Sequence, residues 1–395
     1  MKRFASSETS RNRYSVARLA AESDSRFIDL ICTNFHECGL RYDTDAVRRL
    51  AADYFASGRM SDYNPDPLGA ESTRCAVSDY YKAAGLTVEP EQIVITASAS
   101  ESYSHLFSAL LRDGDQVLLP RPSYPLFEEI AVRAGVEPRY YDQHVKRNWA
   151  IDPDDIVRVV EPETAAIVIV SPNNPTGYIL SDDEIRAIGE ICTRNDMLLI
   201  HDEVFSEYRY GEDACGGLPR PAALCRNVNT VAINGVSKLL AAPDLKVSWM
   251  AVDGPDRSTI VEQLAISNDL FLSASPVNQQ IVARLLAGSD KLTGRIVAEV
   301  GLRRDALIDA VAGCPALTMV PPRGGIHAVL TVDGGSLRGG MDDESIAIAL
   351  LEECRVGLHP GYLYGIEDQT ALVASFLPPQ ERIRDGMKRV CDFLS

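Results

Sequence analysis

The chain has 395 residues, a length that suggests about two domains, and its hydrophobic share of 46% argues against disorder on a large scale. The formal net charge of −17 argues against nucleic acid and anionic membrane surfaces as partners, because such a surface repels phosphate groups. No apolar stretch of the sequence has the length of a membrane-spanning helix.

Nine cysteines are scattered along the chain without a Cys-x-x-Cys pair, a pattern typical of reduced thiols in a cytoplasmic protein. The segment from Cys32 to Cys38 contains His36 and could suggest zinc, but no second pair of ligands lies nearby in the sequence. We therefore expect no metal site.

Short apolar runs alternate with amphipathic stretches from about residue 90 onward. Strands are predicted over 93–96, 116–120, 165–171, 197–203, 230–235 and 247–252. Helices are predicted over 100–111, 124–135 and 181–190, the last because Ser181 and Glu184 have the spacing of a capping box. Fully apolar strands separated by helices predict a largely parallel sheet that is buried on both faces.

The end of the chain has a different pattern, which predicts a smaller α+β domain that N-terminal residues join. We expect a large domain over 48–295, and a small domain made of 1–47, with an N-terminal arm, and 296–395.

Four polar residues stand at or just after the ends of predicted strands. Ser98 follows 93–96, Asn174 follows 165–171, Asp202 ends the strand near 197–203, and Lys238 follows 230–235. In parallel sheets functional groups gather at the carboxyl ends of strands, so these residues predict a shared site.

Each motif also has a plain structural interpretation. SPNNPTG (171–177) could be only a turn, DEVF (202–205) could cap a strand, and the lysine of GVSK (235–238) could be solvated. The combination, in this order and spacing, is more specific, and it resembles fold-type I enzymes that use pyridoxal 5′-phosphate (PLP), in particular the class I/II aminotransferase family. The resemblance runs nearly end to end, with further matches in YNPDPLG, TASASESYS, PRPSYP, LKVSWM and HPGYLYG. It implies an α/β fold with a large domain around a mainly parallel seven-stranded sheet.

The resemblance assigns the chemistry of the cofactor ring to three residues. Asp202 would keep the ring nitrogen protonated, because a carboxylate favours a nearby positive charge. Asn174 would donate a hydrogen bond to the ring hydroxyl. Lys238 would hold the aldehyde carbon as a Schiff base and then, once released, act as the general base for the α-proton.

The cofactor phosphate would be bound mainly by the loop before the helix that starts near residue 100. Ser98, Ala99 and Ser100 match this loop, whose N–H groups can bind an anion, although the two serines could equally be helix caps. Ser237 and Lys246 match the other phosphate contacts.

Two tyrosines complete the resemblance. Tyr124 matches the aromatic residue that stacks on the ring, with ordinary core packing as the alternative. Tyr63 matches a tyrosine that reaches the phosphate of the neighbouring subunit, which implies a homodimer with shared active sites; a loop aromatic is the alternative.

The sequence departs from the family pattern at four positions. Phe205 replaces a tyrosine that donates to the ring hydroxyl, and Lys246 replaces an arginine, so the bidentate fork is lost. Gly235 stands where some relatives have a phosphate-binding serine. Near Val373 the family has an arginine for the substrate carboxylate, and the segment 372–377 contains none.

Candidates to replace that arginine are few. Arg323, beside two glycines, is the first, and His327 and His36 are weaker candidates; each also has a structural interpretation. The small-molecule substrate is expected to be an amino acid or an amino-acid conjugate.

Transamination is the leading hypothesis for the reaction. The missing arginine and Phe205 favour as the main alternative a C–S β-lyase or a decarboxylating deaminase acting on a cysteine S-conjugate, as in lincosamide-like antibiotic biosynthesis. A transcription regulator with this fold is disfavoured by the acidic charge and by PLP-type segments that begin by about residue 30. A dehydrogenase is excluded because no Gly-x-Gly-x-x-Gly follows a strand.

Overall fold

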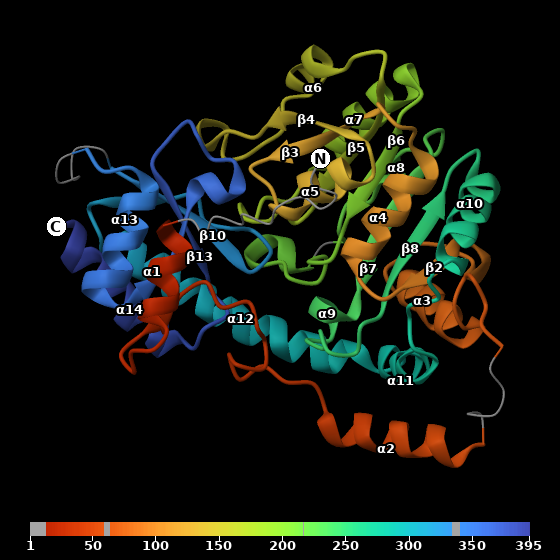
Figure 1. The fold of residues 1–395 in the computed structure, drawn as a ribbon, viewed down its shortest axis with the longest axis horizontal. Coiled ribbons are helices and arrows are strands. Elements are labelled where there is room, and N and C mark those ends of the chain that lie inside the picture. The colour runs from red at the N-terminus through yellow and green to blue at the C-terminus, as the bar shows by residue number, and fades with distance from the viewer. Residues whose placement is uncertain (1–12, 59–63, 216, 334–339) are drawn as a thin grey trace, which may run out of the picture. The chain divides into compact units, whose positions relative to one another are not determined.

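The computed structural model describes residues 13–58, 64–215, 217–333 and 340–395 (Figure 1). The chain divides into two compact units. One comprises Phe35–Gly301 and Pro322–Ile326, and the other comprises the residues up to Asn34, Leu302–Pro321 and His327–Ser395. We call them the large unit and the small unit. The domain limits expected from the sequence remain a prediction.

A seven-stranded sheet forms the centre of the large unit, with the strand order β2-β8-β7-β6-β5-β3-β4. Strand β8 runs antiparallel to both of its neighbours, β2 and β7, and the other neighbouring strands pair in parallel. This confirms the expected α/β class with a mainly parallel sheet. The strands are β2 (Ile93–Thr96), β3 (Gln116–Arg121), β4 (Glu137–Asp142), β5 (Thr164–Val170), β6 (Leu198–Asp202), β7 (Thr230–Gly235) and β8 (Ser248–Asp253).

Alternate residues of these strands face opposite sides of the sheet, and both sides are buried. Val94, Ile233 and Met250 pack with Leu106 and Phe107 of helix α4 (Ala99–Leu110). The strand residues next to them, Ile95 and Trp249 among others, face the other side and pack there in a separate cluster. Figure 1 shows α4 lying across the sheet, where it contacts β7 and β8.

The large unit contains nine more α-helices within the described residues. They are α2 (Thr44–Ala56), α3 (Glu71–Ala83), α5 (Leu126–Arg133), α6 (Pro153–Val159), α7 (Asp182–Asn195), α8 (Pro221–Leu224), α9 (Val236–Leu239), α10 (Arg257–Asp269) and α11 (Pro276–Leu286). The capping box predicted for α7 is confirmed, because Ser181 and Glu184 exchange hydrogen bonds with each other's backbone N–H groups. Helix α12 (Ser289–Ala312) continues past the boundary between the units.

The small unit contains a four-stranded antiparallel sheet, in the order β12-β13-β10-β9, and a parallel pair, β1-β11. The strands are β1 (Ile28–Asp29), β9 (Leu317–Met319), β10 (His327–Val332), β11 (Val356–Gly357), β12 (His359–Pro360) and β13 (Ala371–Ser375). Its other helices are α1 (Arg13–Ala21), α13 (Asp343–Ala349) and α14 (Gln380–Leu394). The N-terminal segment joins this unit because β1 pairs with β11.

Within the described parts of the chain, no helix combines the length and the apolar character that crossing a membrane requires.

Candidate active site

Asp202 ends β6 on the face of the sheet that α4 covers. The hydroxyl of Tyr103 donates to its Oδ2 at 2.9 Å, and the Val204 N–H donates to its Oδ1 at 3.1 Å. Burial raises the pKa of the Asp202 carboxyl to about 6, although both hydrogen bonds act in the opposite direction. A carboxylate held in this way is stabilised by any cation that binds beside it.

Tyr103 was not among the site residues predicted from the sequence. It lies on α4 and is fully buried, so in the sequence it looks like another apolar residue of the helix face that includes Leu106 and Phe107. Its bond to Asp202 joins residues far apart in the sequence. The only sequence signal is a hydroxyl-bearing ring on the core side of the helix that follows the predicted phosphate loop.

Ser98 is the N-cap of α4, and its hydroxyl accepts a hydrogen bond from the Glu101 N–H at 3.1 Å. Ala99 is half-buried and Ser100 is exposed. The Glu101 carboxylate is itself occupied, since it accepts from the Ala97 N–H at 2.6 Å and from the Ser273 hydroxyl at 2.7 Å. The first N–H groups of a helix have no partner within the helix, so this end of α4 can bind an anion.

Lys238 lies on the short helix α9, directly after β7. Its Nζ is 5.8 Å from the centre of the Phe35 ring, and it forms no ion pair with a described carboxylate. Burial lowers the pKa of its ammonium group. The Tyr208 hydroxyl donates to the Lys238 carbonyl at 2.8 Å, which fixes the backbone that carries this lysine.

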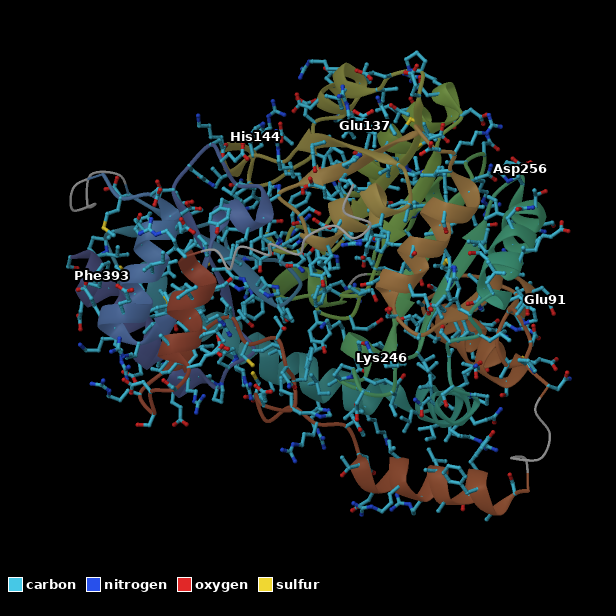
Figure 2. All side chains as sticks on the ribbon, in the orientation of Figure 1. Glu91, Glu137, His144, Lys246, Asp256 and Phe393 are labelled. Carbon is cyan, nitrogen blue, oxygen red and sulfur yellow. The ribbon has the colours of Figure 1, made fainter. Side chains whose placement is uncertain are left out.

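The two other residues expected at the phosphate differ in exposure. Ser237 is half-buried beside Lys238. Lys246 is exposed, in a left-handed conformation with φ 50°, in the loop before β8; Figure 2 labels it near α9.

The Asn-Pro-Thr-Gly segment after β5 assigns different tasks to two neighbouring asparagines. Asn173 holds the turn, because its Oδ1 accepts from the Thr176 hydroxyl at 2.8 Å and its Nδ2 donates to Gln143 at 3.1 Å. Asn174 is half-buried, and its Oδ1 has no hydrogen-bond partner among the described residues. The turn does not need the Asn174 amide, which remains available for a ligand.

Tyr124 lies just before α5, and its ring is 38% exposed. It packs edge-on against Phe127, with 5.6 Å between the ring centres. Burial, and to a smaller extent the negative charge of Asp202, raise the pKa of its hydroxyl. Tyr63, the other tyrosine expected at the site, lies outside the described residues.

Arg323 binds Asp213 through two hydrogen bonds, of 2.6 and 2.7 Å, and its guanidinium carbon lies 6.0 Å from the centre of the Tyr178 ring. It would have to exchange this partner to hold a substrate carboxylate. His36 bonds to the Ala241 carbonyl at 2.9 Å, and His327 lies on β10 of the small unit.

Two departures from the family pattern have a clear structural setting. Phe205 is buried with its ring near that of Tyr208, 6.1 Å between centres, so an apolar ring fills this position. Val373 is fully buried on β13, between Val329 of β10 and His359 of β12. Neither side chain can donate a hydrogen bond.

Comparisons with known proteins place the chain in a family. The model of the protein family described as "Aminotransferase class I and II" matches residues 32–384. The glutamate-pyruvate aminotransferase of Haemophilus influenzae is 28% identical over 84% of this chain and 82% of its own. An S-alkyl-thiohydroximate lyase of Arabidopsis thaliana is 27% identical over 60% of this chain and 52% of its own.

A solved structure of an alanine aminotransferase from Pyrococcus furiosus superimposes with a TM-score of 0.89, at 23% identity, over 97% of this chain and 96% of that one. This likeness confirms the fold. Because the family description covers most of the sequence, the chain belongs to the class I and II aminotransferases, and it is an enzyme that depends on pyridoxal 5′-phosphate.

Proposed function

We propose that the large unit binds PLP at the carboxyl ends of β5, β6 and β7 and uses it for transamination, with Lys238 as the residue that holds the cofactor. The observation that carries this proposal is the arrangement of Asn174, Asp202 and Lys238. They follow or end three neighbouring parallel strands of one sheet. These are the group types that a pyridinium ring with a hydroxyl and an aldehyde requires.

The groups present fit the cofactor because each has a capacity that the protein leaves unused. The side-chain amide of Asn174 makes no hydrogen bond with a described residue, so its Nδ2 can donate to a ring hydroxyl. The Asp202 carboxyl has a pKa raised by burial, which a ring cation would lower again. Lys238 has no carboxylate partner among the described residues, and the first N–H groups of α4 are available to a phosphate. Ser98, Ala99, Ser100, Ser237 and Lys246 are the residues proposed to surround that phosphate, and Tyr124 the ring proposed to stack.

Bound PLP acts as an electron sink that weakens the bonds at the α-carbon of an amino acid. The Nζ of Lys238 then takes the α-proton. Burial lowers the pKa of this amine and so raises its neutral, basic fraction near neutral pH. Tyr103 orients the Asp202 carboxylate, and Asn174 donates to the ring hydroxyl without help from Phe205.

A matched set of variants tests the two central assignments. Lys238→Ala should abolish the visible absorbance of the protein-bound cofactor, because no amine remains to hold its aldehyde carbon. Asp202→Ala should still bind cofactor but turn over almost no substrate. Full activity in either variant would refute the role of that residue, and Lys291→Ala, which removes a lysine from the start of α12, should match the parent protein.

Product analysis decides the reaction. Purified protein with PLP is offered amino acids, with and without pyruvate or 2-oxoglutarate, and the products are identified by mass spectrometry. Amino transfer that requires the keto acid supports transamination. Thiol and pyruvate release from cysteine S-conjugates, or loss of CO2, without any acceptor supports the second candidate instead.

That second candidate is a C–S lyase or decarboxylating deaminase acting on a cysteine S-conjugate, for example in antibiotic biosynthesis. It is favoured by the buried, non-donating Phe205 and Val373, by the Asp213 partner that already occupies Arg323, and by the Arabidopsis relative named as a lyase. Reverting Val373 to Arg would be the first substitution to combine with the product analysis.

The functional unit that we propose is a homodimer with shared active sites, in which Tyr63 reaches the neighbouring phosphate. Support comes from apolar side chains that the large unit leaves exposed around the end of α10, namely Ile266, Leu270 and Phe271. Among the described cysteines, Cys75, Cys192, Cys225, Cys314, Cys354 and Cys391 form no disulfide, which fits the cytoplasmic location proposed for the enzyme.

A further inference from the structure

Gly235 and Ser248 share the space of a single side chain. They are paired across β7 and β8, and a Cβ atom added to Gly235 would lie 2.2 Å from the Ser248 Oγ. The backbone of Gly235 is extended, with φ 178°, so its conformation does not require glycine. The glycine is required because the hydroxymethyl group of Ser248 occupies the place that a side chain at 235 would take.

The sheet register fixes the direction of the Ser248 side chain. Ser248 is also paired with Thr96 on β2, and side chains paired across strands lie on one face. Two residues further along these strands, Val94 and Met250 pack with α4. Because side chains alternate along a strand, Ser248 faces the same side as α4, at the strand ends where that helix begins.

The Ser248 hydroxyl lacks a protein partner, although the side chain is only 2% exposed. It makes no hydrogen bond with any described residue. The paired hydroxyl on β2 differs, since Thr96 Oγ1 bonds to the Ser102 hydroxyl of α4 at 2.8 Å. Because this hydroxyl has no partner in the protein and the residue keeps a small accessible surface, it is suited to a ligand or to ordered water.

We propose that Ser248 is a cofactor-binding residue that donates a hydrogen bond to the PLP phosphate, in place of the serine that Gly235 lacks. This inference rests on the proposed cofactor site. In some relatives the hydroxyl stands on the strand that corresponds to β7, whereas in this chain it stands on the neighbouring strand β8. The Ser248 Oγ lies 2.2 Å from the position that a Cβ atom of residue 235 would occupy. The phosphate would then contact α4 N–H groups, Ser237 and Ser248 from three segments of the large unit.

The experiment compares PLP with pyridoxal, which has the same ring and aldehyde but no phosphate. Each is titrated into the protein freed of cofactor, and its absorbance gives a dissociation constant without any turnover. Ser248→Ala should weaken PLP about 10- to 100-fold, the loss expected for a hydrogen bond to a charged group, and leave pyridoxal binding unchanged. The substitution removes one unpaired oxygen, so the fold should be retained.

Ser102→Ala is the matched control, because it removes a buried hydroxyl on the same side of the sheet that already has a protein partner. It should leave the ratio of the two dissociation constants as in the parent protein. Equal weakening of PLP and pyridoxal by Ser248→Ala, or no weakening, would overturn the role of Ser248.

Binding of PLP and pyridoxal to the parent protein distinguishes a failure of the Ser248 inference from a failure of the proposed cofactor site. If the parent binds PLP no more tightly than pyridoxal, the phosphate site at the start of α4 is wrong as a whole. If the parent prefers PLP and Ser248→Ala keeps the same preference, only the inference about Ser248 fails.

Discussion

In the protein without cofactor, burial favours the neutral form of the Asp202 carboxyl, whereas the role proposed for this residue needs the charged form. Its position at the end of β6 buries the carboxyl, which disfavours the charged form, while a role at a ring nitrogen needs that charged form. Tyr103 and the Val204 N–H offset part of the cost. In the role proposed for it, Asp202 destabilises the protein without cofactor and stabilises a bound cation.

This conflict predicts a pH-dependent gain in stability for Asp202→Asn without cofactor. The folded-state pKa is raised to about 6, while an unfolded carboxyl titrates near 3.9, so the folded protein binds more protons in between. The contribution of Asp202 is fully present below pH 4 and is lost as the pH rises through 6. Above pH 7 the variant should be more stable by up to about 3 kcal/mol, measured by urea unfolding.

Below pH 4 the two proteins should unfold alike, since both carry an uncharged group at this position. A difference that does not change with pH would contradict the assignment of the raised pKa to Asp202. Adding PLP serves as the internal control, because it should stabilise the parent protein more than the variant.

At the scale of a whole element, the start of α4 combines an observed helix cap with the proposed phosphate site. The N–H groups that Ser98 caps and the N–H groups proposed to bind phosphate belong to the same first turn. Capping and anion binding are therefore coupled through one helix end, and a single substitution at Ser98 affects both unless the cap is preserved.

Two substitutions of Ser98 separate these functions. Ser98→Ala should lower the free energy of unfolding by about 1 kcal/mol, because the bond to the Glu101 N–H is lost. Ser98→Asp keeps a cap of equal quality, so its stability should remain near that of the parent, but its negative charge should repel the phosphate and weaken PLP binding. If Ser98→Asp binds PLP as tightly as the parent, Ser98 is a cap and nothing more.

The elements that the sequence predicts well are those with a local signature. Apolar runs predicted six of the seven strands of the large sheet, and the spacing of Ser181 and Glu184 predicted the start of α7. The strand that was missed is β4, whose residues EPRYYD form no apolar run and are mostly only half-buried. Contacts between distant segments have no such signature. The bond from Tyr103 to Asp202 and the pairing of Arg323 with Asp213 depend on how packed elements meet.

When the same residue type occurs twice in one segment, the sequence does not predict which of the two side chains has which role. Asn173 and Asn174 are identical in the sequence, yet only Asn173 holds the turn. The exchange between Gly235 and Ser248 was equally hidden, because the two positions are neighbours only through the pairing of β7 with β8. Residue type and order predicted the cofactor, whereas the proposal for the Ser248 hydroxyl depends on the register of the sheet.

The molecule as a whole is expected to act as a pair of chains. Leu270 is 76% exposed and Phe271 67% exposed at the end of α10, an unfavourable arrangement for a solitary acidic protein. Sedimentation should give about twice the chain mass of 43.1 kDa. Leu270→Glu should shift the protein toward monomers with little loss of fold stability, because the side chain packs little within its own chain.

Val157→Glu, on α6, is the matched control, since it changes an exposed valine of the same unit in the same way and should leave the dimer intact. A parent protein that sediments as a monomer at all concentrations would contradict the shared active site.

The pairing of β1 with β11 has a consequence for how the chain is made on the ribosome. All strands of the large sheet have been synthesised by residue 253, so this sheet can form while the rest of the chain is still being translated. Ile28 of β1, in contrast, can pair with β11 only after Val356 has been synthesised, roughly 330 residues later. At about 5–20 residues per second that delay is some tens of seconds, during which the apolar face of α1 lacks its final partners. The segment that contains α1 and β1 is therefore expected to be among the last parts of the described chain to reach its final packing.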